Sequence, residues 1–453
     1  MLDFLKEELQ FLIIIPIWIL IGMSFAPFAY LVIPATLLLM KNREMYPEIF
    51  MGFLLILILS DTNPEYVSMR WVKTFKNVYM LVIAGIFILD REKFAPHSRI
   101  FTIFLPFIVY SYFPLIFSGN PLIGVQKTIS YSLLLLIVPN YVLYSYRRIG
   151  WTFFRNLILF VMVILVTGYL ISFINPRIVF ISGRFRAYFG NPNGLGIFTY
   201  LIFVLFTLIN FVKKDLFSIV EKVIIYGLVV YFLILCGSRT SLASVLIFLL
   251  LTRFYAISPY LGFVVFLISL AVVEIAIANI HIIVYYFGLQ DFMRLETLDD
   301  GSGRYFAWGF AWAKIQDFFL MGGGFANDEY IMRQHYPYLR SMGHHGGVHN
   351  SYLTMWFNMG LIGLLIYFRS FILVFIRASK RVKIAFPIML SVLFSILYES
   401  WINGSLNPFT ITLFISLTII SESEIYDWKS REENESEIGD EDEHALSSVP
   451  TLK

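Results

Sequence analysis

Residues 349–376 read HNSYLTMWFNMGLIGLLIYFRSFILVFI, an almost continuously apolar run that opens on a histidine and an asparagine. A run of this length can cross a bilayer as a helix, because about 20 apolar residues span the hydrocarbon core. Inside the bilayer an isolated span can satisfy its backbone polar groups only as an α-helix. The stretch therefore predicts a membrane helix with polar chemistry at its first residues.

The same pattern recurs along most of the chain. Hydrophobic residues make up 58% of the 453 residues and charged residues only 14%, and the mean hydropathy is +0.75. A soluble domain would carry about 25% charged residues. We therefore predict an all-α polytopic membrane protein with roughly 12–14 transmembrane helices, of which the first two could instead form a re-entrant hairpin. The expected spans are 11–25, 26–40, 48–60, 77–90, 99–117, 122–144, 153–174, 194–212, 219–236, 240–253, 256–283, 349–376, 383–402 and 407–421.

Basic residues in the short loops predict the orientation, since cytoplasmic loops carry an excess of lysine and arginine. They fall on one side of the alternation, which places both termini in the cytoplasm and the protein in the plasma (inner) membrane. No cleavable signal peptide is expected, because the first ten residues lean acidic and no small-residue cleavage site follows. The loops concerned contain Lys41/Arg43, Arg91/Lys93, Arg147/Arg148, Lys213/Lys214 and Arg377/Lys380/Arg381/Lys383.

Three regions follow from these patterns. Residues 1–420 form the predicted transmembrane helical domain, and residues 285–348 form one large extracytoplasmic loop within it. Residues 421–453 contain 11 acidic and 3 basic residues, a net charge of −8, and should be a disordered cytoplasmic tail. The single cysteine, Cys236, excludes an intrachain disulfide.

Several arginines lie on the predicted extracytoplasmic side and break the positive-inside pattern. Arg177, Arg184 and Arg186 lie in one loop of that side, Arg239 lies at the outer end of two apolar runs, and Arg304 lies in the large loop. Arginine near membrane depth is costly and is usually paired or functional, although it can also snorkel to lipid headgroups. Because guanidinium groups hold phosphate oxygens bidentately, these arginines together favour a pocket for a diphosphate. We interpret Arg70, Lys73 and Lys76 as a structural, amphipathic interfacial stretch instead.

Four of the seven histidines fall between His335 and His349. Their spacing matches no zinc signature closely, so we predict neither a metal nor a cofactor. His349 is a candidate general base, since imidazole accepts a proton near neutral pH; a histidine capped by loop carbonyls is the structural alternative. Asn350 and His345 could orient a substrate, an acceptor or the ring of His349.

Two glycines follow His349 at a fixed distance, Gly360 and Gly363. Small residues let membrane helices approach closely. We therefore expect both glycines to serve helix packing.

Four blocks resemble the O-antigen ligase and polymerase superfamily of membrane glycosyltransferases, in that family's order. Together they cover about residues 184–363, and the last is similar to the family's signature of histidine-asparagine, nine residues and glycine-x-x-glycine. The blocks are FRAYFGNPNGLG (185–196), LCGSRTSLASVL (235–246), GSGRYFAWGFAWAKI (301–315) with MGGGF (321–325), and HNSYLTMWFNMGLIG (349–363).

The resemblance implies a function and roles for these residues. His349 would be the catalytic base, with Arg304 assisting, and Arg186, Arg239 and Arg304 would lie near the pyrophosphate. The implied partners are a polyprenyl-pyrophosphate-linked glycan donor, a glycan or glycolipid acceptor and membrane lipid, with no nucleic acid. The implied reaction transfers the glycan to an acceptor hydroxyl on the extracytoplasmic face, inverts the anomeric carbon and needs no metal.

The sequence leaves several alternative functions open. The chain lacks a clear arginine, ten residues, glycine pattern, which favours a ligase-type transferase over a repeat-unit polymerase, while a protein oligosaccharyltransferase stays open. A flippase or other transporter of lipid-linked glycan would place its charges near the bilayer midplane, often with inverted repeats. Here the charges gather at one face. A scaffold without catalysis would leave the histidines and arginines unexplained.

Overall fold

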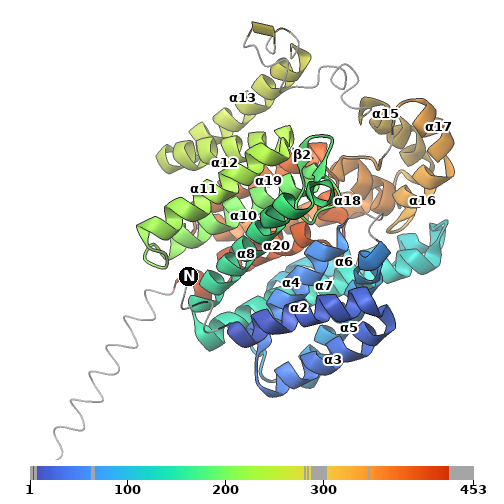
Figure 1. The fold of residues 1–453 in the computed structure, drawn as a ribbon. Coiled ribbons are helices and arrows are strands. Elements are labelled where there is room, and N and C mark those ends of the chain that lie inside the picture. The colour runs from blue at the N-terminus through green and yellow to red at the C-terminus, as the bar shows by residue number, and fades with distance from the viewer. Residues whose placement is uncertain are drawn as a thin grey trace, which may run out of the picture.

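The computed structural model describes residues 4, 8–62, 67–279, 282, 285–286, 304–344 and 346–427. Within these residues the regular structure is almost entirely helical (Figure 1). By length and composition, nine of the described helices can cross a membrane, and five shorter apolar helices accompany them. The fourteen apolar helices confirm the prediction of an all-α polytopic membrane protein.

The first helices form two packed layers at the lower side of Figure 1. α2 (Leu9–Ser24) and α3 (Ala26–Asn42) pack as a hairpin with only Phe25 between them. Arg70, Lys73 and Lys76, which we interpreted as an interfacial stretch, lie in the first two turns of a continuous helix that starts at Arg70. Lys76 Nζ donates to Leu406 O at 3.0 Å. The following elements are α4 (Tyr46–Ser60), η1 (Val67–Met69), α5 (Arg70–Leu89), α6 (Ile100–Ser111) and η2 (Pro114–Phe117).

The middle of the chain alternates long helices with short connections. A two-stranded antiparallel hairpin, which pairs Phe180 with Phe185 and Ile181 with Arg184, interrupts the helices. The elements are α7 (Pro121–Ile149), α8 (Thr152–Ile174), α9 (Pro176–Val179), β1 (Phe180–Ile181), β2 (Arg184–Phe185), α10 (Pro192–Val212), α11 (Ile219–Cys236), α12 (Arg239–Ile257) and α13 (Pro259–Ala278).

The described part of the predicted large loop is folded into helices. Three of these helices, α15, α16 and α17, lie together at one end of the bundle, at the right in Figure 1. The elements of this half are α15 (Arg304–Ile315), η5 (Gln316–Phe318), α16 (Asn327–Gln334), α17 (Tyr336–Ser341), α18 (Ser351–Ser379), α19 (Ala385–Tyr398), η6 (Trp401–Asn403), α20 (Pro408–Ser421) and α21 (Ser423–Tyr426).

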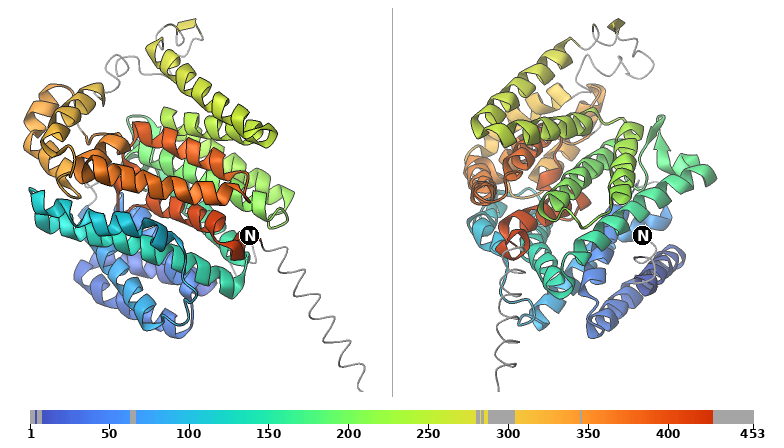
Figure 2. Two further views of the ribbon diagram at one scale, coloured as in Figure 1. Left: turned by 180° about the vertical axis from the view of Figure 1, so that it is seen from behind. Right: turned by 90° about the vertical axis from the view of Figure 1, so that its left-hand side faces the viewer.

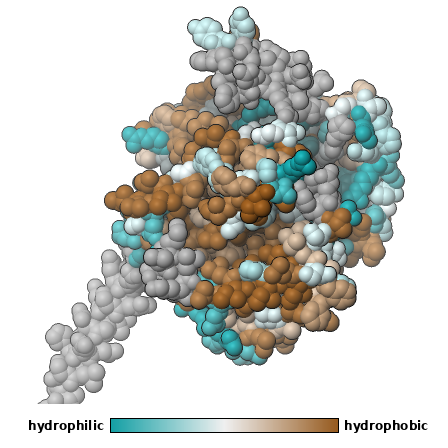
Figure 3. Space-filling model, viewed as in Figure 1, coloured by the Kyte–Doolittle hydropathy of each residue, from teal (hydrophilic) through white to brown (hydrophobic). Residues whose placement is uncertain are grey.

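Three helices make the centre of the bundle. α4, α10 and α20 are buried along nearly their whole length, and α10 packs against α11, α12 and α20. α13 lies at the periphery (Figure 2) and packs mainly on α12. Hydrophobic side chains cover the flanks of the bundle, while hydrophilic ones gather over α15 to α17 (Figure 3). This distribution fits helices that face lipid along their flanks.

A break in α18 joins this helix to the predicted large loop. Gly360 has φ 66° and ψ 179°, so the helical hydrogen bonding is interrupted there. The carbonyls of Phe357 and Asn358 accept instead from the backbone N–H groups of Gly323 and Gly324, at 3.2 and 2.7 Å. The glycine run of the loop thus satisfies the polar groups that the break exposes.

The same contact continues past the break. The N–H of Leu361 donates to Phe319 O at 2.9 Å, and the N–H of Ile362 donates to Leu320 O at 3.2 Å. A Cβ on Gly360 would lie 2.2 Å from Leu320 O. Gly360 is therefore required for its positive φ and for backbone contact with the loop. Gly363 serves helix packing as predicted, because a Cβ there would lie 2.7 Å from the Tyr110 ring of α6.

The first residues of the predicted tail, 421–427, are folded onto the helical bundle. Ser421 ends α20, and α21 is held to the bundle by ion pairs and hydrogen bonds. Arg147 donates to both carboxylate oxygens of Glu424 at 2.7 and 2.8 Å, and Arg381 pairs with Asp427 at 2.6 Å. The rest of the predicted tail lies outside the described residues.

We predict that Gly360→Ala destabilises the docking of the α15–α17 helices on α18. The substitution places a side chain at positive φ, which costs on the order of 1–3 kcal/mol, and it clashes with the Leu320 carbonyl. Thermal melting in detergent and limited proteolysis of residues 304–344 should both report the loss. Gly227→Ala in α11 is the control, because no atom lies within 4 Å of its added Cβ. Equal melting and equal proteolysis of the two variants would contradict the prediction.

Candidate functional site

The first turns of four helices approach one another at the end of the bundle that carries α15 to α17, here called the site face. Asn191 caps α10 by accepting from Gly194 N at 2.8 Å, and Asn350 caps α18 by accepting from Leu353 N at 3.0 Å. α12 begins at Arg239 and α15 at Arg304. Helix N-termini expose N–H groups and the positive end of the helix dipole. Their arrangement makes the site face suited to an anion.

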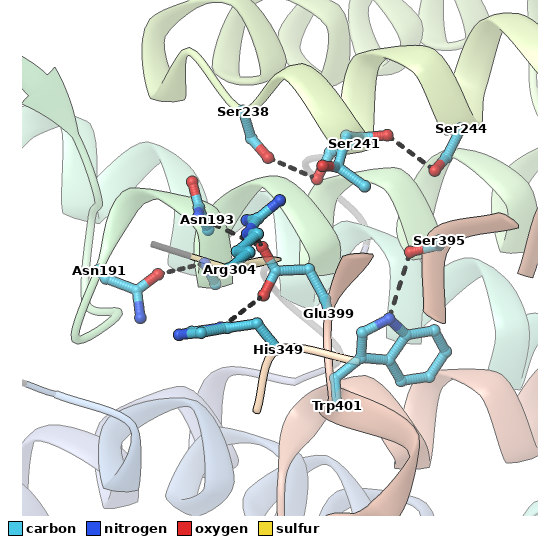
Figure 4. A network of polar contacts seen from close by, with 12 residues as sticks. Asn191, Asn193, Ser238, Ser241, Ser244, Arg304, His349, Ser395, Glu399 and Trp401 are labelled. Atoms are coloured by element: carbon cyan, nitrogen blue, oxygen red, sulfur yellow. Dashed lines mark hydrogen bonds and ion pairs between the residues drawn. The ribbon is translucent and has the colours of Figure 1, made fainter. Parts of the chain in front are cut away.

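Glu399 connects these helix ends (Figure 4). It follows α19 directly and is 7% exposed. One carboxylate oxygen, Oε1, accepts from Arg304 at 2.8 Å and from Asn193 Nδ2 at 3.3 Å. The other, Oε2, lies 3.5 Å from His349 Nδ1. A single carboxylate thus contacts residues from α10, from α15 and from the residue pair that precedes α18.

The backbone around Glu399 is tied down as well. The hydroxyl of Ser351, the first residue of α18, donates to Glu399 O at 2.7 Å, and Asn403 Nδ2 donates to Ser351 O at 3.0 Å. Trp401 follows two residues later, and its indole N–H donates to Ser395 Oγ at 3.2 Å (Figure 4). The carboxylate is therefore held on a braced loop.

Three arginines bring positive charge to the same place. Arg239 is exposed at the start of α12, two residues after Gly237, whose carbonyl accepts from Arg184 at 3.2 Å. Arg184 donates to Asn193 Oδ1 at 2.7 Å, and the same amide donates to Glu399. Arg184, Arg239 and Arg304 form what we call the arginine cluster.

Turn chemistry positions two members of the cluster. Ser182 and Gly183 both have positive φ between β1 and β2, the geometry of a tight two-residue hairpin turn. Arg184 follows this turn and reaches the carbonyls of Cys236 and Gly237 at 2.8 and 3.2 Å. Gly237 ends α11 in the left-handed region, at φ 57°, which allows α12 to start two residues later.

His349 adopts a backbone conformation that is unusual for a residue with a side chain. Its φ is 52°, in the left-handed region, and such strain concentrates at functional sites. The ring turns Nδ1 toward Glu399 and is about one-third exposed (36%). His344 packs 6.0 Å away, ring to ring, and its Nε2 contacts the carbonyls of Gly346 and Gly347. A Cβ on Gly346 would lie 2.4 Å from His349 Nε2, so this glycine leaves room for the ring.

The structure separates the predicted site residues into groups. It brings together His349, Arg304 and Arg239. Arg186 is 3% exposed and donates to the carbonyls of Ile178 and Gly190, both at 3.2 Å. These contacts favour a structural role for Arg186, while Arg184 contacts Asn193, which also donates to Glu399.

The two substrate-orienting candidates also differ. Asn350 is buried and caps α18, so it acts on the orientation of His349 through the backbone. His345 lies outside the described residues.

Two site residues, Asn193 and Glu399, were not predicted from the sequence, and Arg184 was predicted only as one of several extracytoplasmic arginines. Glu399 had a usable signal, since it is an acidic residue at the end of an apolar span in LYESW, where a carboxylate is costly and calls for a partner. Asn193 and Arg184 carried no separate signal, because loops are rich in such residues. Their roles depend on which loops the fold brings together.

The arrangement is suited to holding a doubly charged phosphate group beside a base. Guanidinium groups and helix N-termini bind phosphate oxygens. With Nδ1 facing a carboxylate, the imidazole keeps its proton there and presents the lone pair of Nε2. Across the part of the chain that the structure describes, no group of three His, Cys, Asp or Glu side chains is placed to hold a metal ion.

Comparison with known families gives a match over part of the chain. The fold is that of a polytopic helical membrane protein, and its candidate site combines His349 with the arginine cluster. Residues 224–368 match the model of a family described as O-Antigen ligase. This match confirms the resemblance to the O-antigen ligase and polymerase superfamily of glycosyltransferases. It covers Arg239, Arg304 and His349 but neither Arg184, Asn193 nor Glu399. No curated protein matches the chain.

We predict that Arg186→Gln lowers stability without weakening anion binding. The shorter amide cannot reach both carbonyls, and each buried group left without a partner costs about 1–3 kcal/mol. Melting in detergent should fall relative to Arg340→Gln, an exposed arginine of α17 that serves as control. Unchanged melting together with weaker pyrophosphate binding would return Arg186 to the anion site.

Proposed function

We propose that this protein is a membrane glycosyltransferase of the O-antigen ligase type. It takes a glycan from a polyprenyl-pyrophosphate carrier and transfers it to an acceptor hydroxyl on the extracytoplasmic face of the plasma membrane. The observation that carries the proposal is the Glu399 carboxylate, which contacts both Arg304 and His349. Glu399 thereby holds Arg304, which can bind phosphate, close to the imidazole of His349, which can accept a proton.

The chemistry follows from the two halves of the site. His349 Nε2 removes the proton of the acceptor hydroxyl, and the oxygen attacks the anomeric carbon of the donor sugar. The bond from that carbon to the pyrophosphate oxygen breaks, and its electron pair leaves with the lipid pyrophosphate. Attack from the side opposite the leaving group inverts the anomeric carbon. Because pyrophosphate is a good leaving group, the step requires neither a separate acid nor a metal.

The charges of the site suit this reaction. The arginine cluster and Glu399 together carry a net charge of +2, from three cations and one anion. A pyrophosphate bonded to both a lipid and a sugar carries about two negative charges, and about one more develops as the sugar leaves. The imidazolium that forms on His349 supplies one further positive charge. The balance between site and substrate therefore persists through the step.

The orientation of the protein supports an extracytoplasmic site. The loops with excess lysine and arginine, which positive-inside statistics assign to the cytoplasm, belong to the end of the bundle that binds α21 through Arg147 and Arg381. His349 and Glu399 lie at the other ends of α18 and α19. Lipid-linked glycans on the extracytoplasmic leaflet would reach them directly.

The location of the charges also weighs against a transporter. Transporters bind near the bilayer midplane, at broken helices. Here the cationic groups cluster at helix starts, and the break in α18 is filled by loop backbone.

We predict that His349→Ala and Arg304→Ala abolish glycan transfer while the protein still folds. A positioned base contributes about 10²–10⁴-fold, and one electrostatic donor about 2.7–4 kcal/mol. The measurement is a glycan blot in hosts that lack their own ligase or their own polymerase. Glycan on a surface acceptor in the ligase-deficient host, with wild type only, supports the proposal. Restored ladder length only in the polymerase-deficient host would make the protein a polymerase.

Melting temperatures in detergent control for folding in this experiment. Equal rescue by wild type and His349→Ala would remove His349 from the mechanism and reopen the transporter interpretation.

Two neighbouring glycines give a finer test of the position of His349. Gly346→Ala should reduce transfer about 10²-fold, the order expected for a displacement of about 1 Å, because the new Cβ displaces the imidazole from Glu399. Gly347→Ala should retain activity, since no atom lies within 4 Å of its added Cβ. Both variants should melt like wild type, because the displaced group is the mobile end of a side chain. Equal activity of the two variants would show that the ring position is not needed.

A further inference from the structure

A carboxylate on a membrane helix lies beside the site without a place in the proposed reaction. Glu274 belongs to α13, within a segment long and apolar enough to cross a membrane. It is exposed on the surface of the protein. Acidic residues within membrane segments are costly and mark functional positions. Glu274 therefore calls for an explanation.

Its observed partner is Tyr398, whose hydroxyl donates to Glu274 Oε1 at 2.7 Å. This hydrogen bond connects α13 to α19, and the two helices also pack together. A carboxylate offers about four acceptor positions, and one tyrosine uses one of them. The remaining acceptor capacity is available to a ligand with hydroxyl groups.

Two aromatic residues complete the surroundings. The Trp308 ring lies 6.3 Å from the Tyr398 ring and 5.5 Å from that of Tyr305, which is 53% exposed. The indole nitrogen of Trp308 is buried, and no acceptor for it is found among the described residues. A buried indole N–H usually has a partner; Trp18 and Trp71 also lack one among the described residues, and Trp308 is the one of these three beside the candidate site. It can donate to a ligand that enters beside the ring.

This group is directly connected to the catalytic pair. Tyr398 precedes Glu399 in the chain, and Trp308 follows Arg304 by one turn of α15 on the same helix face. One turn is about 5.4 Å, comparable with the width of a sugar ring. If Arg304 holds the pyrophosphate, the sugar bonded to that pyrophosphate reaches the neighbourhood of Trp308.

We propose that Glu274, Tyr398 and Trp308, with Tyr305 at the rim, bind the first sugar of the lipid-linked donor. This inference rests on the proposed function. The aromatic faces cover the C–H face of the sugar, the carboxylate accepts from its hydroxyls, and the indole N–H donates to one of them. The carboxylate selects for neutral hydroxyls over an anionic phosphate, which leaves the pyrophosphate to the arginine cluster. The lipid carrier holds the sugar near the membrane surface, and Glu274 lies one turn before the end of α13, within reach of that level.

The test uses the full-length protein in nanodiscs and two ligands: polyprenyl pyrophosphate without a sugar, and the same carrier with its glycan. Glu274→Ala should weaken binding of the glycosylated carrier about tenfold or more and leave binding of the bare carrier unchanged. Tyr398→Phe keeps the ring but removes the donor to Glu274, and should change binding less. Ile275→Ala is the control, an exposed neighbour on the same helix. Arg304→Gln should weaken binding of both ligands.

Each outcome separates the two proposals. If Glu274→Ala binds both carriers like wild type while Arg304→Gln loses both, the sugar subsite is overturned and the proposed function stands. If Glu274→Ala lowers melting and weakens both ligands equally, Glu274 is only a tie between helices. If Arg304→Gln binds both carriers like wild type, the pyrophosphate site itself is overturned.

Discussion

The site depends on one carboxylate that is surrounded by positive charge. Glu399 pairs with Arg304 directly and is linked to Arg184 through the side-chain amide of Asn193, so its negative charge offsets part of the positive charge of the arginine cluster. A sheltered carboxylate is stable only with such partners, because removing a charge from water is costly. The same group fixes the imidazole of His349 through Nδ1. Charge balance among these side chains and the orientation of the His349 ring are therefore consequences of a single interaction.

A second constraint on the site comes from the break in α18 at Gly360. The break at Gly360 exposes backbone groups in a membrane helix, where an unsatisfied group is expensive. The glycine run of the preceding loop satisfies them, so the α15–α17 helices have a fixed position relative to α18. Arg304 lies at the start of α15, and His349 lies just before α18. Gly360 and the glycine run 322–324 thus help to set the position of Arg304 relative to His349, although they contribute no side chain to the site.

The sequence predicts this protein well where the membrane dictates structure. Apolar runs must become helices, and the fourteen predicted spans correspond to the fourteen apolar helices. The sequence pointed to Arg239 and Arg304 because arginine near membrane depth is costly, and to His349 because imidazole accepts a proton near neutral pH. Arg184 and Arg186 differ by two residues, and only the tight turn of the β1–β2 hairpin decides which of them reaches the cluster. Backbone geometry of that kind cannot be deduced from residue type.

Glu399 was missed for a related reason. Its partners come from positions 193, 304 and 349, far apart in the chain, and only the packing of α10, α15, α18 and α19 brings them together. The family match ends at residue 368 and so excludes the carboxylate. The matched segment contains His349, the proposed base, and two of the arginines, while the residue that follows α19 supplies the carboxylate that contacts His349 and Arg304. The chemical site is consequently a property of the whole bundle and is incomplete in the matched segment alone.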